Sequence, residues 1–377
     1  MEDKHLHIIS FNIPYPPDYG GIIDVYYKMK ALKSLGVKVH LHCFQYGRSE
    51  TEELQKLCYS VNYYPRKKFY QSVFSSVPYI VGSRQSDELL STLQEDKHPI
   101  LFEGLHTCYY LSHPALQGRK KAVKMHNIEW EYYRSLGKAE KNFFKRFYFF
   151  SESKKLKSFE HELKHADFIF GVSPNDTENL KKLYPQTVYL PVFHQNEVFK
   201  VKAGKGDYAL YHGNLSVVEN NQAAMYLLHK VFADLDMRFI IAGKKPLSSL
   251  KKEVRRYENV ELVADPTDSE MMELISNAHI NILPTFQATG IKLKMLTALY
   301  NGRFCLVNSR MVQNTGLEPL CIIENDSTKI KEKIKKLFER EMDQQEIEER
   351  KKLLDELFSN KNSANLIVKC LYPQIPQ

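Results

Sequence analysis

The chain has 377 residues, 43% of them hydrophobic, and because single cores stop growing near about 250–300 residues we expect two domains. A formal net charge of +8 admits an anionic partner, yet no stretch resembles a zinc finger, an RNP motif or a recognition-helix module, so no nucleic acid is expected. Neither a run of about 18–20 apolar residues nor a signal-peptide pattern occurs, which predicts a cytoplasmic protein. Six scattered cysteines predict reduced core thiols rather than disulfides or a metal site.

The first half of the chain alternates strand-like and helix-like segments. Residues 5–13 favour a strand, residues 14–21 form a Pro/Gly-rich loop, and residues 22–36 have helical spacing up to Gly36. Further strands are expected at 37–44, 59–64, 99–104, 121–126, 167–173 and 187–192. This alternation predicts parallel sheets with helical crossovers, in which binding sites gather at the carboxyl ends of the strands.

The second half contains a new series of strand-like segments after an irregular stretch at 191–207. They are expected at 208–214, 238–244, 260–265, 280–284 and 304–309. We therefore predict an α/β protein of two similar domains, 1–195 and 196–360, with a cleft between them. Residues 361–377 are expected to form a last helix and tail that could cross back to the first domain.

The strongest functional signal is the segment LPTFQATGIKLKMLTALYNGRFCLV at 283–307. It resembles the donor-site signature of retaining GT-B glycosyltransferases of the bacterial polysaccharide-biosynthesis type (glycosyl transferases group 1, family four). The matching residues are Pro284, Ala288, Thr289, Gly290, Lys292, Lys294 and Gly302. A small-residue loop opening a helix favours a diphosphate, because backbone N–H groups, the helix dipole and lysines attract its charge. The alternative is an ordinary strand-to-helix turn with two solvated lysines.

Earlier segments of the second half resemble the same family in the same order. YHGNLSVVENNQAAMYLL is similar to the glycine-containing turn after the first strand of the donor domain, which implies that Gly213 and Asn214 lie close to the donor phosphates. IIAGKKP is similar to the next nucleotide-side turn, with Gly243 and Lys244 facing the cleft. The segment LVADPTDSEMMELISNAHINILP is similar to the one that flanks the base.

The first half resembles the acceptor domain of these enzymes. KMHNIEWEYYRSL places His126 directly after a strand, where the family has a histidine that reaches the cleft. The loop PYPPDYGGI is similar to the glycine-rich loop near the reacting sugar, so Gly20, Gly21 and Asp24 are assigned to the acceptor side. Considered without the family, His126 could equally be a hydrogen-bonded histidine at a strand end.

The resemblance implies a GT-B fold, in which two Rossmann-like domains with parallel sheets face a central cleft. It further implies transfer of a sugar from a UDP-sugar or GDP-sugar donor, with retention, to a glycan or lipid-linked acceptor, in surface polysaccharide or glycoconjugate synthesis. No metal and no cofactor is implied. His126 would hydrogen-bond the donor sugar or line the acceptor path, and lysines with backbone dipoles would stabilise the leaving diphosphate.

Two features depart from the family pattern. Thr289 and Thr297 stand where relatives carry acidic residues that contact the sugar and the ribose, and a hydroxyl is a weaker partner than a carboxylate. The segment SVVENNQAA holds no basic residue, so phosphate charge must be met by Lys244, Lys292 or Lys294. These departures keep open a catalytically silent GT-B homologue that binds a partner protein or glycan; an epimerase acting on a UDP-sugar is a third alternative.

Two stretches mix basic and aromatic residues. KNFFKRFYFFSESKKLKSFEHELK at 141–164 has spacings compatible with a helix, and YYPRKKFYQSVF at 63–74 is similar. Such faces can lie on anionic headgroups, which suggests peripheral contact with the inner face of the cytoplasmic membrane. The alternative is an aromatic stripe facing the core opposite a solvated basic face.

Overall fold

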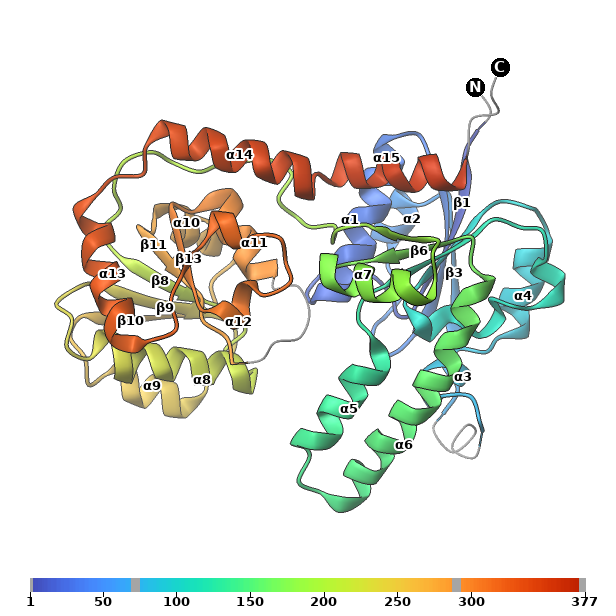
Figure 1. The fold of residues 1–377 in the computed structure, drawn as a ribbon, viewed down its shortest axis with the longest axis horizontal. Helices are drawn as coiled ribbons and strands as arrows, with labels where there is room; N and C mark the ends of the chain where they lie inside the picture. The colour runs from blue at the N-terminus through green and yellow to red at the C-terminus, as the bar shows by residue number, and fades with distance from the viewer. Residues whose placement is uncertain (1–2, 69–74, 287–292, 373–377) are drawn as a thin grey trace. The chain divides into compact units, whose positions relative to one another are not determined.

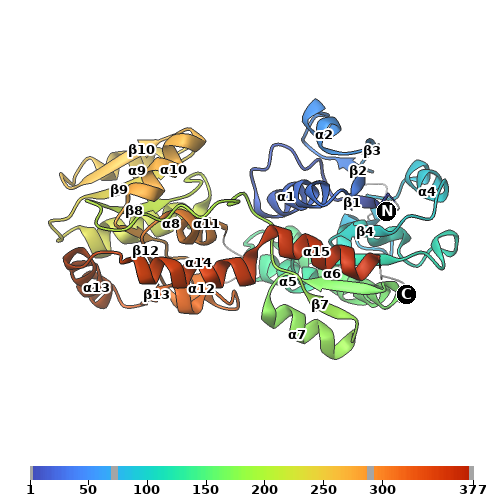
Figure 2. The same cartoon turned by 90° about the horizontal axis from the view of Figure 1, so that it is seen from above.

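A computed structural model describes residues 3–68, 75–286 and 293–372. The chain divides into two compact units, unit 1 with residues 1–194 and 358–377, and unit 2 with residues 195–357. The last helix, α15 (Asn360–Leu371), therefore belongs to unit 1, where it lies beside α1 (Gly20–Ser34) (Figures 1 and 2).

Unit 1 is built on a seven-stranded, wholly parallel sheet in the order β3-β2-β1-β4-β5-β6-β7 (Figure 1). Its strands are β1 (His5–Ser10), β2 (Lys38–Gln45), β3 (Ser60–Pro65), β4 (Ile100–Glu103), β5 (Lys121–Met125), β6 (Phe168–Gly171) and β7 (Thr187–Tyr189). The order reverses between β1 and β4, which are paired in parallel. In open sheets of this type ligands bind at the carboxyl ends of the strands beside such a switch point.

Apolar side chains of these strands alternate between the two faces of the sheet. Ile100 and Phe102 join one core cluster, with residues from α3, α4, α6 and α7, whereas Leu101 joins the other, with residues from α1, α2 and α15. The helices of unit 1 are, besides α1 and α15, α2 (Glu52–Leu57), α3 (Tyr79–Gly82), α4 (Asp87–Gln94), α5 (Glu129–Ala139), α6 (Phe143–Phe159), α7 (Pro174–Leu183) and 3-10 helices at Leu105–Tyr110, Pro114–Leu116 and Glu160–His165. Burial on both faces explains the continuous apolar runs of the strands.

Helices α5 and α6 form a hairpin that projects from the sheet of unit 1 (Figure 1). They pack closely at Gly137, where a Cβ would lie 3.3 Å from side-chain atoms of Phe149 and Phe150. At the tip of the hairpin the aromatic residues are instead exposed: Phe143 by 74%, Phe144 by 80% and Phe147 by 70%. The alternative that the aromatic residues of the stretch 141–164 face the core is therefore wrong for Phe143, Phe144 and Phe147. Of the stretch 63–74, residues 69–74 lie outside the described residues.

Unit 2 contains a six-stranded parallel sheet in the order β10-β9-β8-β11-β12-β13. Its strands are β8 (Ala209–His212), β9 (Phe239–Gly243), β10 (Val260–Ala264), β11 (Ile280–Ile282), β12 (Phe304–Val307) and β13 (Ile322–Ile323). Its helices are α8 (Val218–Leu227) continued by a π-helical turn at Leu228–Phe232, α9 (Ser248–Val254), α10 (Asp268–Asn277), α11 (Leu293–Asn301), α12 (Ser309–Val312), a 3-10 turn at Glu318–Leu320, α13 (Ser327–Glu339) and α14 (Gln344–Phe358). The strand order again reverses, here between β8 and β11.

The predicted α/β class with two parallel sheets is confirmed, and a strand is present in each predicted segment. Only β13 was not predicted, because two residues give no readable alternation. The first long helix starts at Gly20 and ends just before Gly36, whose φ of +77° suits a glycine. The cysteines are free thiols, but Cys58, Cys321 and Cys370 are only half-buried, so the expectation that all six are core residues is wrong for these three.

Candidate active site

The switch point of unit 1 carries a cluster of charged side chains. Glu103 ends β4 and His126 follows β5, so both stand at the carboxyl edge of the sheet. Lys28 and Asp24 reach the same place from α1, which follows β1. The Nζ atom of Lys28 donates to Oε1 of Glu103 at 2.6 Å and to Oδ2 of Asp24 at 2.9 Å. A lysine thus bridges two carboxylates beside the switch point.

The burial of this cluster determines its charge states. Asp24, Lys28 and Glu103 have no exposed side-chain surface. Burial alone would lower the pKa of Lys28, but the two carboxylates outweigh it and raise this pKa above its ordinary value. Burial likewise opposes ionisation of Asp24 and Glu103, yet Lys28 above all holds the pKa of each carboxyl below its usual range. The cluster is therefore an ionised network.

A second lysine connects the cluster to the end of the first half of the chain. Lys124 of β5 is fully buried and donates from Nζ to the carbonyl oxygens of Leu190 and, at 2.9 Å, of Pro191. Burial lowers the pKa of Lys124 to about 8. The backbone N–H of Phe193 donates to Oδ1 of Asp24 at 2.7 Å. Asp24, assigned above to the acceptor side, is thus enclosed by protein and holds α1 against the segment that follows β7.

His126 is the member of the cluster with exposed surface, 10% of its side chain. Its Nε2 lies 3.0 Å from Oε2 of Glu103, so Nε2–H donates to the carboxylate, and its Nδ1 lies 3.8 Å from Oδ2 of Asp24. Asp24, Glu103 and His126 offer three ligand atoms within 4.8 Å of one another. However, the Lys28 ammonium already lies between the two carboxylates, so these residues fit a metal ion poorly.

Around His126 the backbone lies so close to neighbouring side chains that glycine is needed at two positions. Gly104 has φ +72°, and a Cβ there would lie 2.9 Å from Nδ1 of His106 and 3.6 Å from Cδ2 of His126. At Gly21 a Cβ would lie 2.8 Å from the Phe11 ring, which in turn contacts the His126 ring edge to face at 5.5 Å between centroids. Gly21 therefore permits the packing that sets the position of the His126 ring, whereas the neighbouring Gly20 is exposed and has no atom within 4 Å of such a Cβ.

Next to this network lie a buried carboxyl group and a half-buried imidazole, neither of which has a close counter-charge among the described residues. Oε1 of Glu129, at the start of α5, lies 3.9 Å from Nδ1 of His106. Burial raises the pKa of Glu129 to about 7. Burial, followed by the charge of Arg84, holds the pKa of His106 well below its usual range. A neutral imidazole and an acid that titrates near neutrality thus adjoin the ionised cluster.

In unit 2 the two predicted glycine turns are in contact. Gly213 follows β8 and Gly243 ends β9, and a Cβ at Gly243 would lie 1.8 Å from the carbonyl oxygen of Gly213. Only glycine is compatible with this approach. Leu215 N–H donates to the Lys244 carbonyl at 2.9 Å and joins the two turns. The two segments singled out in the sequence therefore form one edge of the unit 2 sheet.

Lys294 lies at the switch point of unit 2. From the first turn of α11, its Nζ donates to Oδ1 of Asn220 at 3.0 Å and to the Tyr211 hydroxyl at 3.4 Å. Asn220 in turn donates to the carbonyl oxygen of Asn214 at 3.0 Å. The chain of contacts brings Lys294, predicted to meet phosphate, together with the turn at Asn214.

His212, the last residue of β8, adds a neutral group beside Lys294. Burial, and then the charge of Lys294, lowers the pKa of His212 to about 3. Among the residues that the structure describes, its Nε2 is buried without a hydrogen-bond partner. A polar atom in this state is uncommon and suggests a ligand contact.

The other donor-side residues differ in their surroundings. Lys244 is exposed and pairs with Asp268 at 3.4 Å, where both side chains are mostly in solvent. Thr297 is buried in α11, and its hydroxyl accepts from Asn196 at 3.4 Å. Thr289, Gly290 and Lys292 lie outside the described residues, as does Ala288.

Several residues of these clusters were not predicted. They are Lys28, Glu103, His106 and Lys124 in unit 1, and His212 and Asn220 in unit 2. A signal existed for Glu103, since a carboxylate that precedes a glycine at a predicted strand end stands where parallel sheets bind ligands. The sequence contained no such signal for Lys28, because a lysine in a helix usually faces solvent.

Comparison with known proteins gives one clear sequence relative. An uncharacterized 44.6 kDa protein in the cps region of Klebsiella pneumoniae is 26% identical over 327 residues, which cover 82% of this chain and 84% of that protein. No family model matches the sequence.

Solved structures match nearly the whole chain at low identity. TarM has a TM-score of 0.67 at 8% identity, covering 99% of both chains. Anabaena Alr3699/HepE in complex with UDP and glucose has a TM-score of 0.65 at 10% identity, covering 98% of this chain and 99% of its own. The E. coli trehalose-6-phosphate structure with UDP-2-fluoro glucose has a TM-score of 0.63 at 11% identity, covering 99% and 100%. The fold is therefore that of GT-B glycosyltransferases.

Proposed function

We propose that this protein is a retaining, metal-independent glycosyltransferase that moves a sugar from a nucleotide-sugar donor to a glycan or lipid-linked acceptor in surface polysaccharide or glycoconjugate synthesis. The observation that carries the proposal is that each doubly wound sheet places a candidate site residue at its switch point, Lys294 in unit 2 and His126, held by Glu103, in unit 1. The GT-B fold and the similarity to a protein from a cps region both support this proposal.

In the proposed donor site, unit 2 holds the nucleotide diphosphate. The contact between the glycine turns at Gly213 and Gly243 brings both backbones to one edge of the sheet, where phosphate oxygens would bind. Lys294 would supply positive charge, as would Lys292, which lies outside the described residues. When the bond between the anomeric carbon and the diphosphate breaks, negative charge develops on the leaving group, and a pre-positioned ammonium stabilises it.

In the proposed sugar site, unit 1 contributes His126. Its Nε2–H is committed to Glu103, which fixes the ring and leaves Nδ1 as an acceptor. A ring held in this way can accept a hydrogen bond from a sugar hydroxyl. Asp24, Lys28 and Glu103 are positioning residues, because they have no exposed surface with which to touch a substrate.

The test is a screen of donors by calorimetry and thermal shift with UDP, GDP and their common sugar derivatives, followed by donor hydrolysis and transfer assays. A UDP-sugar is the expected ligand, since two of the similar solved structures carry UDP or a UDP-sugar. A preference for a GDP-sugar would change the donor and keep the reaction class. Binding to none of these nucleotides would overturn the proposal.

One observation favours a catalytically silent homologue instead. Thr297 replaces the acidic residue expected to bind the ribose, and its hydroxyl is buried toward Asn196. Loss of one charged hydrogen bond costs about 1.5–3 kcal/mol of affinity. If the substitution abolishes catalysis, the protein will bind nucleotide or glycan without donor hydrolysis or transfer. Thr297→Glu then tests the ribose contact by its effect on donor affinity.

We further propose that the tip of the α5–α6 hairpin contacts an anionic membrane surface, which would suit a lipid-linked acceptor. No helix in the described part of the chain is long and apolar enough to cross a bilayer. Instead, Phe143, Phe144 and Phe147 stand exposed beside four exposed cations, which are Lys138, Lys141, Lys145 and Arg146. Exposed aromatic rings flanked by basic side chains match the apolar boundary and the charged headgroups of such a surface.

Vesicle sedimentation tests this contact. Wild-type protein should bind vesicles rich in phosphatidylglycerol and release them as salt rises. Replacing Phe143, Phe144 and Phe147 by serine should weaken binding at least about tenfold, because burial of each ring contributes about 1.5–3 kcal/mol when complete. Leu183→Ser, an exposed apolar residue of α7, serves as the control and should change nothing. Equal binding by the triple variant would refute the hairpin as the contact.

A further inference from the structure

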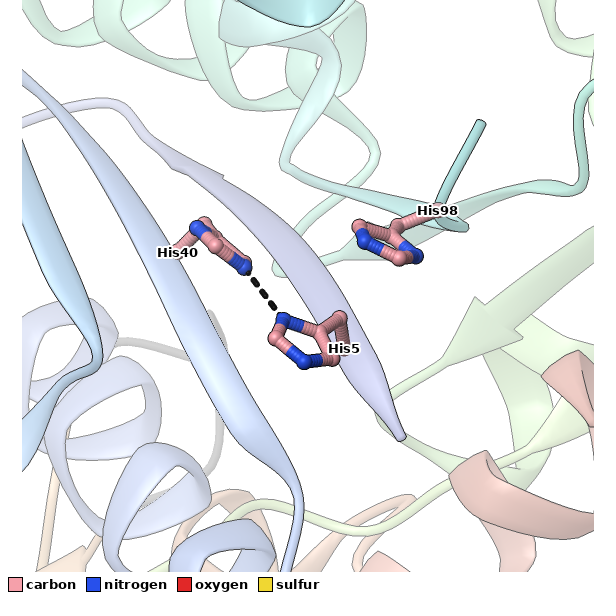
Figure 3. Close-up of side chains that lie close together, drawn as sticks. All are labelled: His5, His40 and His98. Atoms are coloured by element: carbon pink, nitrogen blue, oxygen red, sulfur yellow. Dashed lines mark hydrogen bonds between the residues drawn. The ribbon is translucent and has the colours of Figure 1, made fainter. Parts of the chain in front are cut away.

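A separate group of histidines lies on unit 1 near the amino ends of its strands. His5 begins β1, His40 lies in β2, and His98 lies between α4 and β4 (Figure 3). Because the strands are parallel, this edge is opposite the one that holds Glu103 and His126. The histidines are therefore separate from the proposed sugar site.

The three rings lie within ligand distance of one another. Each side chain is half-buried and offers one ring nitrogen, and these nitrogens lie within 4.8 Å of each other. The rings of His5 and His98 stack at 4.6 Å between centroids, and those of His5 and His40 at 5.1 Å. Nδ1 of His5 lies 2.8 Å from Nε2 of His40 (Figure 3).

We propose that His5, His40 and His98 bind a divalent transition-metal ion, with Zn²⁺ as the best match to three imidazoles. Zinc–nitrogen bonds of about 2.0–2.1 Å in tetrahedral geometry place two ligand nitrogens roughly 3.3 Å apart. The nitrogens of His5 and His40 must then separate by only about half an ångström from 2.8 Å. Three protein ligands leave the fourth position for water or another small ligand.

The surroundings orient the ligands. Nδ1 of His40 lies 2.9 Å from the Ser60 hydroxyl, so its second ring nitrogen is held and Nε2 is directed to the site.

Beneath the site a second layer of hydrogen bonds fixes the two strands. Nδ1 of His7 lies 2.8 Å from Nε2 of His42, and Nδ1 of His42 lies 2.9 Å from the Tyr64 hydroxyl. His7 also contacts Asp96 at 2.9 Å, and the Asp96 carboxylate accepts the His98 backbone N–H at 2.9 Å. The segment that carries His98 is thereby tied to the same face, so the site is largely preformed.

Two cationic side chains near the histidines are paired with carboxylates, which reduces their repulsion of a bound cation. Lys38 pairs with Asp3, and Nη2 of Arg119 contacts Oδ1 of Asp96 at 2.7 Å. These two cationic side chains thus each have a carboxylate partner. A bound ion would connect β1, β2 and the segment before β4, and we expect it to stabilise unit 1 rather than take part in sugar transfer.

The experiment is calorimetric titration of tag-free, chelator-treated protein with ZnCl₂, together with thermal unfolding. Wild-type protein should bind one ion and unfold at a higher temperature when zinc is present. His98→Ala, in an irregular segment, should weaken binding at least about tenfold, and His40→Ala should abolish it. His161→Ala, an exposed histidine elsewhere in unit 1, is the matched control and should bind as wild type.

Co²⁺ provides a second readout that does not depend on stability. Tetrahedral coordination by imidazoles should give a visible absorption band in wild type and in His161→Ala, and His98→Ala should lose it. Circular dichroism checks that each variant is folded. Absence of zinc binding by folded wild-type protein, or the same affinity in His98→Ala, would overturn the proposal. Donor binding should be unaffected in all three variants, so this result is independent of the proposed transferase activity.

Discussion

The two sheets share one strand order, yet the lysines at their switch points are bound in different ways. In unit 1, Lys28 lies between Asp24 and Glu103, so its charge is neutralised within the protein. In unit 2, Lys294 contacts the neutral amide oxygen of Asn220 and the phenol of Tyr211. The same topology thus places one lysine in a buried ion-pair network and the other beside neutral acceptors.

The comparison distinguishes a lysine that supports the fold from one that is proposed to bind a ligand. Burying an ion pair has a high desolvation cost. Because the two charges neutralise each other, the pair attracts a third charge only weakly. The Asn220 and Tyr211 acceptors of Lys294 are neutral, so neither of them offsets the charge of its ammonium group. Lys294 is therefore the better candidate for the phosphate, and Lys28 for fixing Glu103 and, through it, His126.

The largest expected effect is on stability. Glu103→Ala leaves the Lys28 charge with one carboxylate fewer, and breaking a buried ion pair costs about 3–5 kcal/mol. Urea unfolding measures this loss. Lys56→Ala, which removes an exposed ion pair with Glu53 in the same unit, should leave the free energy of unfolding nearly unchanged. A similar cost for both substitutions would show that the Lys28 network does not hold unit 1 together.

An intermediate effect is expected on donor binding. Lys294→Ala removes a charge-assisted phosphate contact worth about 1.5–3 kcal/mol, so donor affinity should fall roughly tenfold to hundredfold in calorimetry. Lys244→Ala is the matched control, since that side chain is mostly in solvent beside Asp268, and its effect should be within about threefold. Unchanged affinity in Lys294→Ala would remove the contrast between the two lysines.

An effect that depends on pH, and is absent at low pH, concerns Glu129, whose carboxyl, unlike that of Glu103, is buried without a bridging lysine. Its pKa is about 7 in the folded protein and near 4.5 when exposed. The folded state therefore keeps a proton that the unfolded state releases, and this contribution to stability, complete below pH 4.5, is lost as pH rises through 7.

Glu129→Gln, which mimics the protonated acid, should match wild type near pH 4.5 and be more stable at pH 8 by up to about 3 kcal/mol, the equivalent of the difference between the two pKa values. Urea unfolding of both proteins at the two pH values measures the difference. A constant difference between the two proteins at both pH values would show that Glu129 ionises normally.

Local patterns in the sequence predicted the alternating elements well, because strand length, apolar runs and glycine stops are set by neighbouring residues. The turns at Gly213 and Gly243 were identified separately, and His126 was singled out at a strand end. Their environments could not be predicted, since the contact between the two glycine turns depends on how β8 and β9 pair.

Only the tertiary structure determined which charged side chains are in contact. Asp24 and Lys28 are one helical turn apart, but Glu103 lies 75 residues beyond Lys28, and parallel pairing of β1 with β4 brings them together. The exposure of Phe143, Phe144 and Phe147 was equally hidden, because an aromatic residue in an amphipathic pattern usually faces a core. Sequence alone determined the elements and the candidate edge residues; burial and long-range pairing, which depend on the whole fold, decided their charge states and their roles.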